Sequence, residues 1–265
     1  MKEFLRAYCL LVATSLRSAM QYRFSFVATT VGSGLIGLVD FLMLAAVLLR
    51  FKAIDGWNVY EVALLYGTSA AALGLFRTLG SQIYEFDAYL VNGELDSLLV
   101  RPWDPLFLLL ARKFDAGRIG QPMHALIVTV LAAVHLVRSG ALSPLAAALI
   151  PLCIVNGTLV YAGISIATAT VGFWTTRIDD LQTITIYAPS TAAEYPLSIL
   201  PGWLRGLLHT ILPVALTNYL PLLYLLGKGA PWYILPVCLA ATGFYLVLVW
   251  RFWQYGLRKY NSTGS

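Results

Sequence analysis

The side chains that could carry out chemistry in this sequence are few and widely separated. His124, His135 and His209 lie far apart and lack the spacing of a metal site. The pair Gly227-Lys228 lacks the upstream glycine and the following Ser or Thr of a phosphate-binding loop. We therefore expect no catalytic residue, no metal ligand and no bound cofactor in this chain. Energy for any active process must come from another molecule.

Asp40 is the only acidic residue that we place inside an apolar stretch long enough to cross a membrane. Burying a charge in lipid is expensive, so such a residue is a functional candidate by default. It could form a substrate or proton site, or it could be a packing residue bonded to a nearby Ser or Thr. A proton-coupled carrier normally needs several such groups, so Asp40 alone is thin support for one.

The charged residues gather in one segment, Leu75 to Lys113, which interrupts an otherwise apolar sequence. Six of the thirteen acidic residues lie between Arg77 and Arg118, together with several basic ones. The middle of the segment reads Gly93-Glu94-Leu95-Asp96-Ser97-Leu98-Leu99-Val100-Arg101-Pro102. A mixed-charge, amphipathic segment between two apolar stretches is suited to contact water or a soluble partner.

The composition indicates an all-α membrane protein with several spans. Of the 265 residues, 59% are hydrophobic and only 12% are charged, whereas an ordinary soluble domain has about 25% charged residues. A soluble domain of this size would have too little charge to cover its surface. The net charge of +5 is typical of cytoplasmic basic residues in a membrane protein rather than of a nucleic-acid-binding surface.

Six membrane-spanning helices are expected, because each needs about 20 mostly apolar residues. The clear ones cover residues 24–49, 59–76, 119–137, 139–176 and 229–250. The stretch 139–176 is too long for one upright span and too short for two, so we expect one long, tilted or kinked helix. Pro144 and Pro151 lie near its start.

The position of the fifth span is ambiguous between residues 181–200 and residues 206–227. We favour 181–200. Segment 202–226 would then enter the membrane and return to the same, extracellular side between the fifth and sixth spans. Pro201, Pro213 and Pro221 would break it into short re-entrant helices.

The distribution of Lys and Arg predicts the orientation. With a cytoplasmic N-terminus, thirteen of the 18 basic residues fall on the inside, as the positive-inside rule requires. Both termini and the segment Leu75 to Lys113 are then cytoplasmic. Residues 1–23 place apolar and basic side chains on different stripes, which predicts an amphipathic helix on the inner leaflet. Residues 24–265 form a single transmembrane domain.

The order of these elements resembles that of ABC-2-type permeases of ABC transporters, and most closely a branch once catalogued as a domain of unknown function. The motif from Gly93 to Pro102 is similar to the family pattern after the second span. The stretches Tyr195 to Leu204, Leu212-Pro213 and Asn218 to Pro221 resemble the end of the fifth span and the extracellular re-entrant helices. The resemblance covers nearly the whole chain.

The resemblance implies a non-enzymatic permease subunit of an exporter in the cytoplasmic membrane. Family members pair with a second permease, identical or different, and bind two ATPase subunits that hold ATP and Mg²⁺. Residues 80–113 would be the coupling segment, which carries the coupling helix and docks on the ATPase. Its expected partner-binding residues are Glu85, Asp87, Gly93, Glu94, Leu95, Asp96, Leu98, Leu99, Arg101 and Pro102. The leucines would be apolar anchors, and the acids would pair with basic residues of the ATPase.

We expect the substrate pathway to run along the interface between two permeases. Gly32, Gly34 and Gly37 would permit close helix contact there, whether with the partner or with a neighbouring span, and Asp40 would lie nearby. The alternatives are an ion- or proton-coupled carrier and a membrane scaffold that transports nothing. The sequence leaves the substrate open, and lipid is expected around the spans.

Overall fold

The computed structural model describes residues 13–14, 17–18, 20–51, 53–112, 114–175 and 177–260. Five of its helical spans are long and apolar enough to cross a membrane, which confirms a multi-span, mainly α-helical protein. They are built from α2 (Arg23–Phe51), α3 (Val59–Leu79), α7 (Gly120–Arg138), α8 with α9 (Pro144–Ala148, Ile150–Thr175) and α14 (Ile234–Lys259). Most of the predicted helix 1–23 lies outside the described residues.

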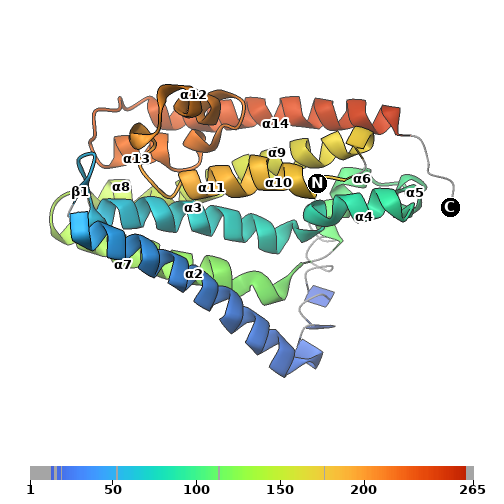
Figure 1. The fold of residues 1–265 in the computed structure, drawn as a ribbon, viewed down its shortest axis with the longest axis horizontal. Helices are drawn as coiled ribbons and strands as arrows, with labels where there is room; N and C mark the ends of the chain where they lie inside the picture. The colour runs from blue at the N-terminus through green and yellow to red at the C-terminus, as the bar shows by residue number, and fades with distance from the viewer. Residues whose placement is uncertain are drawn as a thin grey trace.

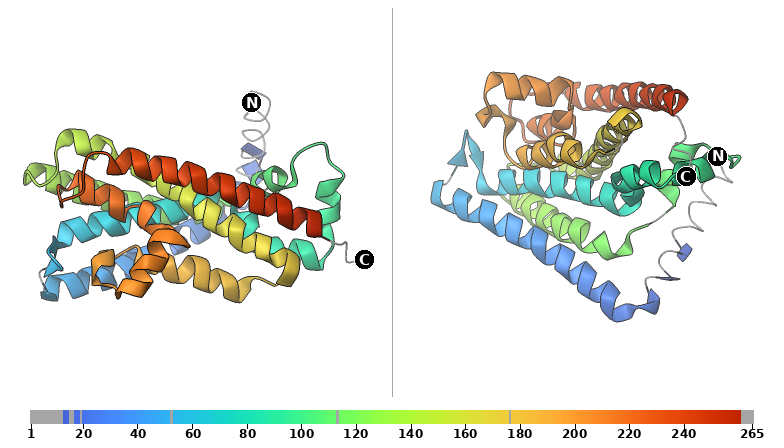
Figure 2. Two further views of the ribbon diagram at one scale, coloured as in Figure 1. Left: turned by 90° about the horizontal axis from the view of Figure 1, so that it is seen from above. Right: turned by 45° about the vertical axis from the view of Figure 1, so that its right-hand side comes forward.

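The spans form a layered bundle (Figures 1 and 2) in which α3 is the central helix. It packs between α7 and α9, while α2 covers α7 and α14 covers α9. Close contact depends on small residues: a Cβ at Gly74 would lie 2.9 Å from the backbone nitrogen of Pro122. The central position explains why most of α3 is buried, whereas α2 and α14 present broad apolar faces to the outside.

A short hairpin that the sequence interpretation missed connects α2 to α3. Strand β1 (Ala53–Ile54) pairs with β2 (Trp57–Asn58) across an Asp55-Gly56 turn. Both turn residues have positive φ, 48° and 77°, as a two-residue hairpin turn requires. Helix α3 then begins at Val59, the predicted start, because Asn58 and Glu61 form a capping box.

The predicted long fourth span is confirmed, and it is broken near its start. Helices α8 and α9 together make one span of 32 residues. The break falls at Leu149, two residues before Pro151. Proline has no backbone N–H, so Pro151 cannot donate the helical hydrogen bond to the carbonyl of Ala147, which fits a break at this point.

The region of the fifth span is made of short pieces rather than one straight helix. A helical run covers Asp179 to Ala192, built from α10 (Asp179–Gln182), a π-helical turn (Thr183–Tyr187) and α11 (Ala188–Ala192). The predicted continuous helix over 181–200 is therefore too long. The helical run ends before Tyr195-Pro196, because a residue that precedes proline is disfavoured in helical conformation.

The chain after this run bends repeatedly. A 3-10 turn (Leu197–Ile199) leads to α12 (Gly202–Thr210), and a second 3-10 turn (Val214–Leu216) leads to α13 (Tyr219–Leu225). Helix α12 and the stretch Val214–Leu225 meet at 71°, so they form either one broken span or a re-entrant loop. Both lie toward the end of the molecule that holds the β1–β2 hairpin and α8 (Figure 1).

Two buried asparagines fasten this bent region to the bundle. Asn218 donates from Nδ2 to the carbonyl of Leu65 in α3 (2.8 Å) and to that of Ala193 after α11 (2.9 Å). Asn156 in α9 donates to the carbonyl of Leu216 at 2.8 Å. The carbonyls of Ala193 and Leu216 lie where the helices break, and these bonds give them side-chain donors.

Candidate functional site

The predicted coupling segment, residues 80–113, lies at the end of the bundle opposite the hairpin (Figures 1 and 2). It folds as a 3-10 turn (Ser81–Glu85) followed by α4 (Phe86–Val91), α5 (Glu94–Leu99) and α6 (Pro105–Ala111). The chain returns to α7 through a further 3-10 turn, Ala116–Ile119. The segment thus contains three short helices, and α5 lies within the motif Gly93 to Pro102. Gly93, with φ of 68°, permits the break between α4 and α5.

The leucines of the motif are divided between the interior and the surface. Leu95 is 0% exposed and Leu98 is 2% exposed, and they belong to the same apolar core as Leu106 and Leu109 of α6. In this structure Leu95 and Leu98 hold α5 in place, so they offer no anchor to a partner. Leu99, at 40% exposure, is the motif leucine that remains on the surface.

The exposed tip of the segment follows directly after Leu99. Val100 is 86% exposed and Trp103 is 41% exposed, and Arg101 and Pro102 between them are exposed as well. Helix α6 begins immediately afterwards with Asp104 as its N-cap, accepting from the backbone N–H groups of Leu106 and Phe107. The tip, Leu99 to Trp103, therefore combines apolar side chains with one cation on a firmly held loop.

The four acidic residues differ in their surroundings. Glu85 is exposed and accepts a hydrogen bond from Gln82 at 3.1 Å, whereas Asp87 is half-buried. Glu94 is exposed and pairs with Arg112 at 3.3 Å. Asp96 is half-buried and lies near Tyr260, which follows α14. The pKa of Tyr260 is raised, first because Tyr260 is partly buried and second because of the negative charge of Asp96. Glu94 and Asp96 thus already have neighbours within the chain.

Three contacts attach the coupling segment to the membrane helices. Gln182 of α10 donates to the carbonyl of Tyr84 at 2.9 Å. Gln254 of α14 donates to Asp104 at 3.2 Å. Phe86 packs against the fully buried Trp253 of α14 with ring centres 5.2 Å apart. These contacts join the coupling segment to α10 and α14.

Gly34 and Gly37, two of the three candidate pathway glycines, face a neighbouring helix of the same chain. A Cβ at Gly34 would lie 3.3 Å from the carbonyl oxygen of Gly120 in α7, and a Cβ at Gly37 would overlap the ring of His124. Gly32 has open space around its Cα. Gly34 and Gly37 therefore serve the packing of α2 on α7, and Gly32 is the one free to face another molecule.

Asp40 belongs to a group of polar side chains within the bundle. Tyr66 of α3 donates to the carbonyl of Gly37 at 2.7 Å, and its hydroxyl lies 3.1 Å from Nε2 of His124. The exposed Asp40 interacts electrostatically with Tyr66, His124 and Glu194. The four side chains come from α2, α3, α7 and the chain after α11, so the fold brings together residues far apart in sequence.

The expectation that Asp40 is the only acidic residue inside a span is wrong. Glu61 lies in the first turn of α3, where it is 8% exposed and pairs with Lys228 at 3.0 Å. Glu194 lies within the segment predicted as the fifth span and interacts with Asp40 and Arg77. Both acids fall inside the spans predicted at 59–76 and 181–200, so the sequence alone was enough to identify them as acidic residues within spans.

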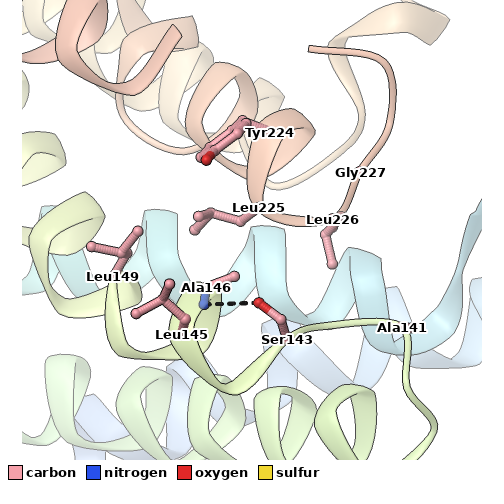
Figure 3. A pocket seen from close by; sticks show the side chains of 9 residues that line it. All are labelled: Ala141, Ser143, Leu145, Ala146, Leu149, Tyr224, Leu225, Leu226 and Gly227. Atoms are coloured by element: carbon pink, nitrogen blue, oxygen red, sulfur yellow. Dashed lines mark hydrogen bonds between the residues drawn. The ribbon is translucent and has the colours of Figure 1, made fainter. Parts of the chain in front are cut away.

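A small cavity of about 300 Å³ lies at the hairpin end, between α8 and α13 (Figure 3). Leu145 and Leu149 line one side, and Tyr224 and Leu225 line the other. Ser143 caps α8 by accepting from the N–H of Ala146 at 3.1 Å. The lining contains no acidic or basic side chain. In the part of the chain that the structure describes, no cluster of His, Cys, Asp and Glu is arranged to hold a metal ion.

Comparison with known proteins agrees with these features. A family model described as "ABC-2 family transporter protein" matches residues 35–264, which includes the coupling segment, the polar group around Asp40 and all spans except the start of α2. No curated protein matches the chain. Because the family match extends over most of the sequence, the chain belongs to the ABC-2 family of membrane transporter proteins.

Proposed function

We propose that this chain is the permease subunit of an ABC exporter, driven by ATP that separate subunits hydrolyse. The observation that carries the proposal is the coupling segment, a firmly attached group of short helices with an exposed tip at one end of a membrane bundle. Leu99, Val100 and Trp103 supply the apolar surface of the tip, and Arg101 supplies a charge. An apolar centre with a charged rim is typical of a protein interface.

The orientation follows from the same segment. If its tip docks on a soluble ATPase, the described end of α14 and the start of α2 also lie toward the cytoplasm, since they point to that end of the molecule (Figure 1). The hairpin, α12 and α13 then lie toward the outside. In this arrangement α12 and α13 form a re-entrant segment, and the stretch from Asp179 to Leu200 is the fifth crossing element.

A second permease would cover α2. Its exposed face is apolar along much of its length, with Leu35 at 55%, Ile36 at 68% and Met43 at 64% exposure. Gly32 and Asp40 are on this helix, so a pathway between two permeases would pass them. Glu94 and Asp96 would pair with basic residues at the ATPase rim when docking separates them from their neighbours within the chain.

The test is binding of the cognate ATPase subunits to tip variants. Val100→Glu and Leu99→Glu should abolish co-purification of the ATPase, because each places a charge at the centre of the docking surface while leaving the core leucines unchanged. Ile211→Glu is the matched control, since Ile211 is 70% exposed after α12, away from the tip. If the ATPase binds the tip variants as well as it binds wild type, the docking surface lies elsewhere.

The polar group around Asp40 favours one second candidate, a proton-coupled carrier. Asp40 is a charged neighbour of both His124 and Glu194, and a carrier of this type needs several such groups. Flux in sealed vesicles that contain only this chain would distinguish the two functions. A flux that follows a proton gradient without ATPase subunits supports the carrier, whereas dependence on ATP and the ATPase supports the permease.

A further inference from the structure

We infer that the end of α14 near the coupling segment carries a binding site for the headgroup of an anionic phospholipid. The site is a shallow cavity of about 420 Å³ along one face of the helix. Its lining residues are Trp250, Arg251, Gln254, Tyr255 and Arg258. Trp250, Gln254 and Arg258 are four residues apart, and so are Arg251 and Tyr255. These spacings place the five residues on one stripe of an α-helix.

The opposite face of the same helix is fixed in the core. Trp253 is 0% exposed and packs on Phe86 and Phe173 with ring centres 5.2 Å apart in both cases. Gly256 is buried beside Phe173. Because this inward face is held, the stripe with the two arginines points away from the bundle, toward whatever surrounds the protein.

The two arginines are available for a ligand. Arg251 and Arg258 are both exposed, and neither forms an ion pair with a carboxylate among the residues that the structure describes. Guanidinium groups bind phosphate through paired N–H donors, which makes arginine well suited to a phosphodiester. Two unpaired arginines about two helical turns apart form a positive surface that a phospholipid headgroup would neutralise.

Aromatic residues place this surface at the boundary between lipid and water. Trp250 is 52% exposed and Tyr255 is 55% exposed, and the neighbouring Trp174 stacks on Tyr255 with ring centres 5.9 Å apart. Trp and Tyr concentrate at the level of the headgroups. The apolar part of α14 before Trp250 lies beside the acyl chains, so the arginines meet the phosphate layer of one leaflet.

The site is adjacent to the coupling segment, because Gln254 donates to Asp104 at the start of α6. In the proposed orientation this is the cytoplasmic leaflet, the side on which anionic lipids attract basic residues close to the membrane. The inference takes only this membrane placement from the proposed function. Lipid binding can therefore fail while the role as an ATPase-driven permease stands.

Lipid retention by the purified full-length protein tests the site. The protein is reconstituted in vesicles of phosphatidylcholine and phosphatidylglycerol and extracted in mild detergent, and the lipids that stay bound are counted by native mass spectrometry. Wild type should retain phosphatidylglycerol in preference to phosphatidylcholine. The double variant Arg251→Gln/Arg258→Gln should retain about tenfold less, because each basic residue near an anionic surface strengthens binding severalfold.

Two matched variants separate this site from general charge effects. Arg138→Gln/Arg205→Gln also removes two exposed positive charges, but near the hairpin end, and should bind phosphatidylglycerol like wild type. Arg251→Lys/Arg258→Lys keeps the charge and should retain most of the lipid. Equal loss in the control pair, or no loss in Arg251→Gln/Arg258→Gln, would overturn the inference.

A fluorescence measurement covers the case in which the glutamine variant does not fold. Brominated phosphatidylglycerol should quench the fluorescence of the wild-type protein more than brominated phosphatidylcholine does. Trp250→Phe should reduce this difference, because Trp250 lines the site. If the difference between the two lipids persists in Trp250→Phe at its wild-type size, the lipid binds elsewhere.

Discussion

The guanidinium carbon of Arg77 lies 4.8 Å from the centre of the Tyr187 ring, close enough for a cation–π contact. It also lies 5.9 Å from the ring of Tyr84. Arg77 is near the end of α3, Tyr84 begins the coupling segment, and Tyr187 ends the π-helical turn that follows α10. Helix α3, the coupling segment and the π-helical turn therefore meet at one side chain, and Gln182 of α10 adds a hydrogen bond to the carbonyl of Tyr84.

Replacing Arg77 with methionine tests what this junction contributes to coupling. The Nε and Nη2 atoms of Arg77 are buried without hydrogen-bond partners among the described residues, which offsets part of the benefit of the cation–π contacts. Arg77→Met also removes the positive charge that interacts with Glu194, so it should lower the free energy of unfolding. The complex with the ATPase should assemble but hydrolyse ATP severalfold more slowly. Arg101→Met is a control for stability only. Wild-type ATP turnover in Arg77→Met would show that the junction transmits nothing.

Much of the fold follows from the sequence, because long apolar stretches determine where helices can cross the membrane. The start of α3 was also readable, since Asn58 and Glu61 form a capping box. The dipeptide Asp55-Gly56 is equally typical of a two-residue hairpin turn, so the hairpin was predictable too. The region 181–226 was not predictable in detail, because several prolines permit breaks at many positions and tertiary contacts such as those of Asn218 select among them.

The coupling segment was likewise predictable only in part. Its place in the chain, residues 80–113, followed from its mixed charge. Leu95, Leu98 and Leu99 lie on one helical stripe, so spacing alone could not separate the two that α6 buries from the one on the surface. The interaction of Asp40 with Glu194 depends on where the chain turns after α11, which no local pattern determines.

Two glycines of α2 should respond differently to the same substitution. Gly37→Ala places a methyl group into the ring of His124 and should break its hydrogen bond with Tyr66, lowering the melting temperature by several degrees. Gly32→Ala meets open space and should leave the melting temperature of the isolated chain unchanged. Thermal unfolding followed by size-exclusion fluorescence measures both. Equal stability of the two variants would contradict the close packing of α2 on α7.

The ion pair of Lys228 and Glu61 should hold the hairpin against the loop before α14. Lys228 Nζ lies 3.0 Å from Glu61, donates to the carbonyl of Gly56 at 2.8 Å and sits 4.8 Å above the ring of Trp57. Lys228→Met leaves Glu61 buried without its cation and should lower the free energy of unfolding by about 2–4 kcal/mol. Lys228→Met/Glu61→Gln should recover part of that loss. A double variant no more stable than Lys228→Met alone would mean that the pair is not coupled.

Asn218 should be the most sensitive polar residue of the bent region. It is 0% exposed, and its Nδ2 donates to the carbonyls of Leu65 and Ala193, which belong to α3 and to the chain after α11. Asn218→Ala removes the Nδ2 donor from the carbonyl of Ala193 and breaks the bond to Leu65, whose carbonyl still accepts from Thr68. The loss of about 1–3 kcal/mol should appear as poor expression and early thermal unfolding. Thr210→Val, which removes an exposed hydroxyl bonded within its own helix, should change stability little. If Asn218→Ala unfolds at the same temperature as Thr210→Val, α3 and the bent region are held together by apolar packing alone.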